Sequence, residues 1–172
     1  MSELLRRLLT FIDQFAELTG KVIAPLLALM LLATFTVVIS RYGFDYGAAK
    51  LQESVVYLHA TVFMLGFGYT LKQGGHVRVD IFYQRLGNRS QAIVNLTGTL
   101  LFLMPMSGFI LYASIDYVSF SWQFKEGSPD PGGLPFVYLM KTLIPLSAIL
   151  LLLQGLGELV RSLKLLGQTQ RG

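Results

Sequence analysis

Few side chains in this sequence are suited to chemistry. Most of the side chains that are suited to it lie near an end of one of several long apolar runs. Glu53, His59, Asp116, Lys141 and Glu158 are the ionisable residues inside or at the margins of these runs. An ionisable group within a membrane span is costly to bury, and it is therefore a functional candidate. A proton relay needs a deeper string of such groups, so their positions near the ends favour interhelical pairing or hydration at an interface.

The two histidines, His59 and His76, support neither a cofactor site nor a catalytic site. A bis-histidine haem site needs two histidines that face each other within a bundle, but His76 lies in a basic loop. The sequence has no cysteine, which excludes disulfides, thiolate metal sites and thiol catalysis. Gly74-Gly75 follows an apolar run rather than a strand, so it does not form a phosphate-binding loop. We expect no catalytic, cofactor-binding or metal site in this chain.

Four apolar runs are long enough to cross a bilayer as helices. The chain has 172 residues, of which 53% are hydrophobic and only 14% charged, against about 25% charged in soluble domains. A spanning helix needs roughly 20 mostly apolar residues, and these runs are apolar on all sides, unlike the alternating strands of a barrel. The sequence therefore predicts an all-α integral membrane protein with spans at about residues 22–39, 51–71, 92–115 and 134–157.

The N-terminal segment predicts an amphipathic helix that lies in the membrane interface before the first span. Apolar residues recur at helical spacing from Leu4 to Phe15, and charged residues fall largely on another face. Gly20-Lys21 would permit the turn into the membrane. A signal peptide is disfavoured because the apolar run starts only after Lys21 and is long enough to span. The predicted parts are an interfacial helix at 1–20, a four-helix transmembrane domain at 21–165 and a cytoplasmic tail at 166–172.

The most distinctive stretch is the second predicted span together with the loop that follows it. In the loop, His76, Arg78 and Asp80 alternate with apolar residues, which suits a short interfacial segment or one packed against another subunit. With this motif, four spans and a basic side, the chain resembles the small membrane subunit of tripartite ATP-independent periplasmic (TRAP) transporters. The residues that carry the resemblance are Arg41, Glu53, Gly66, Gly75, His76, Arg78 and Asp80.

The resemblance implies an auxiliary subunit rather than a transporter or an enzyme. TRAP transporters take up organic acids with a sodium gradient as the driving force, and the sodium and substrate sites belong to a large membrane permease subunit. A periplasmic protein captures the substrate, and the small subunit enlarges the scaffold of the large one. By this resemblance the chain is a multi-pass protein of the bacterial inner membrane, with the large permease subunit and the periplasmic substrate-binding protein as its partners.

Two other classes of membrane protein share the four-helix pattern. A self-contained small-molecule exporter should place an acid well inside its first span, whereas residues 22–39 contain none. A membrane anchor subunit of a redox complex is disfavoured by the histidine count. A nucleic-acid partner is not expected despite the net charge of +4, because the basic residues cluster beside apolar runs.

We predict that both termini face the cytoplasm, because basic residues near the ends of spans mark the cytoplasmic side. With this orientation ten basic residues lie inside and four outside. The inner ones are Arg6, Arg7, Lys21, Lys72, Arg78, Arg85, Arg89, Arg161, Lys164 and Arg171, and the outer ones are Arg41, Lys50, Lys125 and Lys141. Reporter fusions after Gly133 and Gly172 should report outside and inside, respectively. The reverse result, or the same side for both, would contradict this topology.

Overall fold

All regular elements are helical in the part of the chain that the structure describes, which comprises residues 3–74, 83 and 85–169 of a computed structural model. No strand occurs in these residues. Four helical segments are long and apolar enough to span a membrane, which confirms the predicted number of spans. The elements are α1 (Glu3–Gly43), α2 (Ala49–Lys72), α4 (Asn88–Gly98), the π-helix η1 (Thr99–Leu103), α5 (Met104–Gln123) and α6 (Val137–Thr169).

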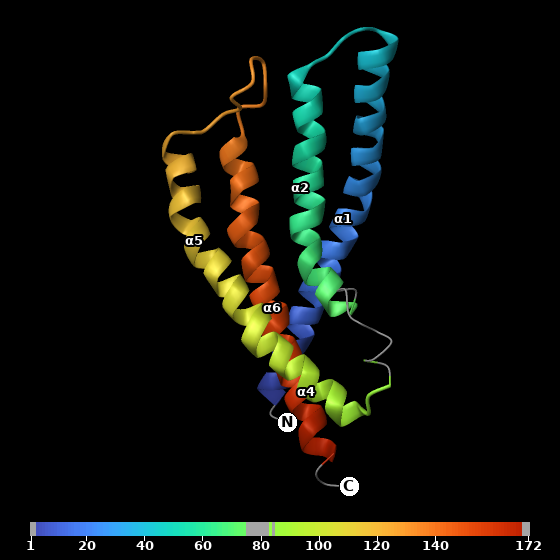
Figure 1. Ribbon diagram of the computed structural model, residues 1–172, viewed down its shortest axis with the longest axis vertical. Helices are drawn as coiled ribbons and strands as arrows, with labels where there is room; N and C mark the ends of the chain where they lie inside the picture. Colours follow the sequence, from blue (N-terminus) through green and yellow to red (C-terminus); the bar gives the residue numbers. More distant parts are fainter. Residues whose placement is uncertain (1–2, 75–82, 84, 170–172) are drawn as a thin grey trace.

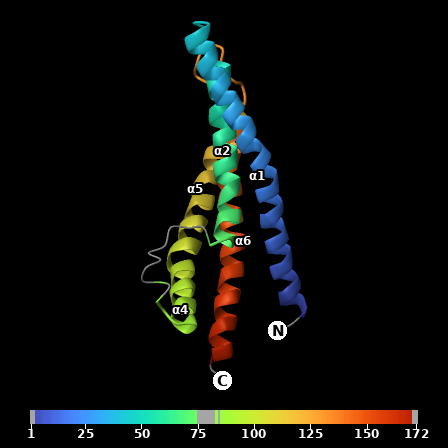
Figure 2. The same cartoon turned by 90° about the vertical axis from the view of Figure 1, so that its right-hand side faces the viewer.

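The helices form two hairpins, α1–α2 and α5–α6, which separate toward one end of the molecule (Figure 1). Among the described elements, α6 contacts every other one: it packs on α2, α4, η1 and α5 and touches α1. The start of α1 and the end of α6 lie at the same end of the bundle (Figure 2). This agrees with an even number of spans and with termini on the same side of the membrane.

Helices α4, η1 and α5 run on as one span, Asn88–Gln123, with a π-helical turn in its interior. The Met104 amide donates to the Thr99 carbonyl, which is the five-residue spacing of a π-helix. Pro105 follows directly, and its ring removes a donor from the regular ladder. Single π-turns and prolines are the usual causes of local kinks in long helices.

Helix α1 is continuous, and the turn predicted at Gly20-Lys21 is wrong. Both residues lie inside the helix, so residues 3–20 form the first half of α1 rather than a separate element. Gly20 instead serves packing: a Cβ atom built there would come within 2.6–2.9 Å of the Tyr69 ring of α2. The absence of a side chain lets α1 approach α2 closely at this point. The interfacial placement of residues 1–20 stays a prediction.

The core consists largely of small polar side chains. On α5, Ser107, Ser114 and Ser121 are buried at a spacing of seven residues, and on α6 the buried residues include Ser147 and Ser162. A seven-residue spacing keeps these positions on one face of a helix. In a bilayer, lipid tails are as apolar as leucine, so close packing of small residues holds helices together instead of hydrophobic burial.

Candidate functional site

Most charged residues of the four spans lie near one or the other end of the bundle. Lys21 and Arg41 enclose an uncharged stretch of α1 about 30 Å long, at about 1.5 Å per residue. The corresponding limits are Glu53 and Lys72 in α2, Asn95 and Asp116 in α4–α5, and Lys141 and Glu158 in α6. Each pair is about 25–32 Å apart along its helix, which matches the hydrocarbon thickness of a bilayer. The candidate functional site therefore consists of polar networks at the two membrane faces.

Glu53 joins the two hairpins at the outer end. Its Oε1 accepts a hydrogen bond from the Ser128 hydroxyl, and its Oε2 accepts one from the Leu134 amide at 2.6 Å. Ser128 and Leu134 belong to the connection between α5 and α6, whereas Glu53 lies in the first turns of α2. A Cβ atom at Gly133 would approach Glu53 Oε1 to 2.6 Å, so only glycine fits beside the carboxylate.

The connection itself is shaped by a tight turn at residues 130–133. The Gly133 amide donates to the Asp130 carbonyl at 2.9 Å, which closes a four-residue turn. Pro131 occupies its second position, and Gly132 its third with a φ of +78°. This is the sequence preference of a type II turn, where proline fixes φ and glycine tolerates a positive φ. The turn brings Ser128 and Leu134 together opposite Glu53, and the Ser128 amide donates to the Leu134 carbonyl at 3.0 Å.

A second outer network joins α5 to α6 through Glu126. Its carboxylate accepts hydrogen bonds from Lys141 Nζ at 2.5 Å and from the Ser121 hydroxyl at 2.6 Å. These bonds, that from Lys141 foremost, hold the pKa of Glu126 below its ordinary value, so the carboxylate stays ionised at neutral pH. Lys141 also lies over the Tyr117 ring, 4.0 Å from its centroid. The Trp122 indole donates a hydrogen bond to Thr142 Oγ1 at 2.9 Å, which also joins α5 to α6.

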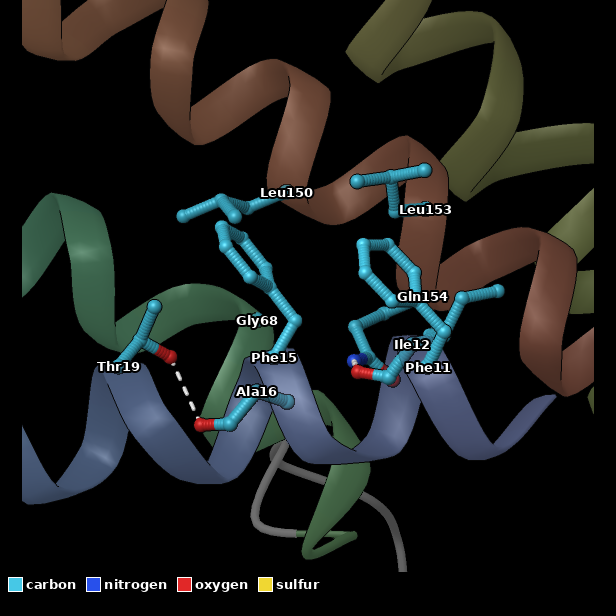
Figure 3. Close-up of a pocket in the computed structure, with 9 residues that line it drawn as sticks. All are labelled: Phe11, Ile12, Phe15, Ala16, Thr19, Gly68, Leu150, Leu153 and Gln154. Atoms are coloured by element: carbon cyan, nitrogen blue, oxygen red, sulfur yellow. Dashed lines mark hydrogen bonds between the residues drawn. The ribbon is translucent and has the colours of Figure 1, made fainter. Parts of the chain in front are cut away.

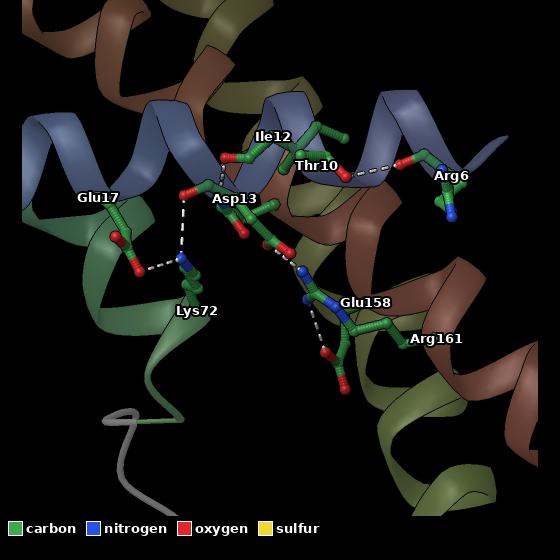
Figure 4. Close-up of polar contacts among 9 residues, drawn as sticks. Arg6, Thr10, Ile12, Asp13, Glu17, Lys72, Glu158 and Arg161 are labelled. Carbon is green, nitrogen blue, oxygen red and sulfur yellow. Dashed lines mark hydrogen bonds and ion pairs between the residues drawn. The ribbon is translucent and has the colours of Figure 1, made fainter. Parts of the chain in front are cut away.

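At the inner end, charged residues of α1 hold the two neighbouring helices (Figure 4). Asp13 forms an ion pair with Arg161 of α6, which also lies 3.6 Å from Glu158. Lys72, at the end of α2, donates to Glu17 at 2.8 Å and to the Asp13 carbonyl at 3.0 Å. The polar face of the first half of α1 thus packs inward on α2 and α6.

The inner network continues from α6 to α4. Glu158 accepts a hydrogen bond from the Asn95 side chain at 3.0 Å, and Asn95 in turn accepts one from the Tyr83 hydroxyl at 3.0 Å. Gln91 donates to the Tyr83 carbonyl at 3.1 Å. The predicted interhelical pairing is confirmed for Glu158, and Glu53 and Lys141 are also paired, in their cases with the α5–α6 connection.

A small pocket lies between α1, α2 and α6 near the inner end (Figure 3). Its walls are apolar except for Thr19 and Gln154, and they include no charged side chain. The Gln154 amide donates to the Ile12 carbonyl at 3.1 Å, whereas its Oε1 is buried without a partner in the described structure. The described residues also contain no group of three His, Asp or Glu side chains placed to hold a metal ion. The described lining of the pocket presents no charged group to an organic acid or a cation.

The structure places only part of the predicted motif. Arg41 is exposed at the end of α1, Glu53 clamps the outer connection, and Gly66 faces open space on α2. No hydrogen bond or ion pair joins these three residues, so they do not form one cluster. The other motif residues, Gly75, His76, Arg78 and Asp80, lie outside the described residues.

Sequence reasoning missed the partners in these networks. The acidic residues Asp13 and Glu17 belong to the charged face predicted for the N-terminal helix, but the sequence does not indicate which basic residues bind them, nor that Glu126 binds Lys141. Each pair joins residues far apart in the chain, apart from Glu126 and Lys141. The only signal was an acid and a base placed at the same predicted membrane face.

The comparison with known proteins decides the class of the chain. Residues 30–165 match the family described as tripartite ATP-independent periplasmic transporters, DctQ component. The chain belongs to this family. DctQ proteins are components of TRAP transporters, in which they work with a large permease and a periplasmic binding protein. No curated protein and no solved structure matches the chain. The family and the four apolar helices make it a multi-pass membrane subunit of a transporter.

We predict that Glu53→Leu loosens the outer connection of this DctQ protein, because it removes both acceptors from Ser128 and the Leu134 amide. Hydrogen–deuterium exchange of residues 128–134 should become faster by about tenfold, since hydrogen bonds to charged groups are the stronger ones. Asp130→Ala is the matched control, because this exposed carboxylate lies in the same turn. Equal exchange in both variants and the native chain would show that Glu53 does not clamp the connection.

Proposed function

We propose that the chain is the auxiliary small subunit of a sodium-coupled TRAP transporter for organic acids, and that it enlarges the scaffold of the large permease subunit. The family match over residues 30–165 is the observation that carries this proposal. The large subunit holds the substrate and sodium sites, and a periplasmic protein delivers the substrate. The complex resides in the bacterial inner membrane, and both termini of this chain face the cytoplasm.

The distribution of polar groups supports an auxiliary role. Charged residues of the described spans lie at the two membrane faces, where most are held in pairs within the chain. Between the two layers, the spans carry no charged side chain. Secondary transporters bind their substrates near the midplane with broken helices and exposed polar groups. Four such helices add width and packing surface to a partner but do not supply a route for an anion.

The first half of α1 supports a placement along the inner membrane surface. At about 1.5 Å per residue, the 41 residues of α1 are about 60 Å long, twice the hydrocarbon thickness. Residues 3–20 continue α1 from Lys21 toward the inner side, and Asp13 and Glu17 among them pair with Arg161 and Lys72 at the inner ends of the α6 and α2 spans. Leu8, Phe11 and Leu18 are exposed on the same part of α1. We propose that this apolar face rests in the interface and braces the subunit laterally.

We propose an assembly role for the motif at residues 75–80, and no role in substrate chemistry. The chain is fixed on both sides of it: Lys72 binds α1, and Tyr83 binds Asn95 of α4. Arg78 is suited to pairing with Asp80 or with anionic lipid head groups. A motif held between two such anchors is suited to contacts with a neighbouring subunit at the inner membrane face.

Reconstitution into liposomes tests the proposed function. Uptake of an organic acid should require this chain, its cognate large permease subunit, the periplasmic binding protein and an inward sodium gradient. Liposomes that lack any one of these, or in which a potassium gradient replaces the sodium gradient, should show no uptake. Uptake by this chain alone would overturn the auxiliary role and favour the self-contained exporter.

A further inference from the structure

One face of α2 is exposed, and it carries the polar imidazole ring of His59. The helix lies between α1 and α6 and contacts both (Figure 1). On its remaining side, Gln52, Val56, His59 and Phe63 are exposed, and Gly66 continues the row. The steps of four, three, four and three residues place all five on one helical face. We name these five residues the α2 face.

His59 lies within the hydrocarbon layer of the bilayer. It follows Glu53 by about 9 Å along the helix axis, at about 1.5 Å per residue. Its ring stacks on Phe63 with 6.0 Å between centroids, and no described residue forms a hydrogen bond or ion pair with it. An imidazole carries a donor and an acceptor, or two donors when charged, and lipid tails satisfy neither. Ionisable residues at such depth almost always face protein or a water-filled cavity.

Gly66 leaves an open notch on the same face. A Cβ atom built at Gly66 would meet nothing within 4 Å, whereas one at Gly68 would lie 3.4 Å from Leu150 Cβ of α6. Gly68 therefore serves packing inside the chain, and Gly66 does not. At a membrane helix surface, a glycine lets the backbone of another helix come close.

The exposed side of α1 shows what a lipid-facing surface of this chain looks like. Leu27, Leu31, Phe35 and Val38 are exposed there, and the hydroxyl groups of the exposed Thr34 and Thr36 donate to carbonyls of α1 itself. Asp116 of α5 is also exposed, but it lies at the outer limit of its span, where water hydrates it. Between the residues that bound the four described spans, His59 is the only His, Lys, Arg, Asp or Glu side chain, and it is exposed.

We propose that the α2 face is the surface on which a transmembrane helix of the large permease subunit docks. The docked helix passes close to Gly66 and places a hydrogen-bonding side chain opposite His59. This inference rests on the proposed function, because that function supplies the membrane-embedded partner. A membrane helix with a polar group satisfies the imidazole, which lipid does not.

Site-directed cross-linking locates the contact, and the chain contains no cysteine that would interfere. Val56→Cys and Phe63→Cys, each labelled with a benzophenone maleimide in membranes that also hold the large subunit, should give a photoproduct of both chains. Phe35→Cys on α1 is the matched control, because its side chain is equally exposed but faces the proposed lipid side. It should give no such product.

Copurification tests the notch. Gly66→Leu should lower the amount of large subunit recovered with this chain by about tenfold, since close helix approach is lost. Gly108→Leu on α5 is the matched control, because a Cβ atom there also meets nothing within 4 Å. It should leave recovery unchanged. His59→Ala should also lower recovery, and His59→Gln, which keeps hydrogen-bonding groups, should restore part of it.

The outcomes separate the docking surface from the proposed function. If the large subunit copurifies but cross-links at Phe35→Cys and not at the α2 positions, the docking surface is wrong and the function stands. Cross-links between two copies of this chain at the α2 positions would overturn the heteromeric contact. If the large subunit does not copurify with the native chain, the proposed function fails and the docking inference fails with it.

Discussion

The structure depends on one constraint: a hydrocarbon layer about 30 Å thick solvates neither charges nor unpaired backbone groups. The spans respond by forming helices and by placing most of their charges at two levels separated by about that thickness, as Glu53 and Lys72 show in α2. At both levels the charges then bind each other. Asp13 with Arg161 fixes the inner end, and Glu126 with Lys141 fixes the outer end. Between the levels, small residues do the packing.

The sequence predicts the spans well because this constraint acts on each segment separately. A long apolar run must cross the bilayer as a helix whatever its neighbours are, so the four spans and the end positions of Glu53 and Lys141 follow from composition and spacing. The same reasoning places Gly74-Gly75 after a span. These features depend on residues that are close together in the chain, so they can be predicted from the sequence.

The contacts between segments cannot be predicted from the composition and spacing of each segment alone. Gly66 and Gly68 look alike in the sequence, yet only Gly68 packs on α6. Gly20 looks like a turn but fits against Tyr69, so α1 continues as a helix through this point. The clamp of Glu53 on Ser128 and Leu134 depends on how the two hairpins meet. Each of these outcomes is set by tertiary contacts between distant residues, which one sequence does not contain.

The two charge levels also connect the fold to the proposed supporting role of the subunit, because most of these charges fix the ends of its own bundle. The depth of α1 in the bilayer tests this account most directly. Single spin labels at cysteines placed along residues 6–43 should show the greatest accessibility to oxygen near Leu31. Beyond Lys21 and Arg41 the accessibility to oxygen should fall, and the accessibility to a water-soluble nickel complex should rise. A maximum in the first half of α1, or uniform accessibility along it, would contradict the account.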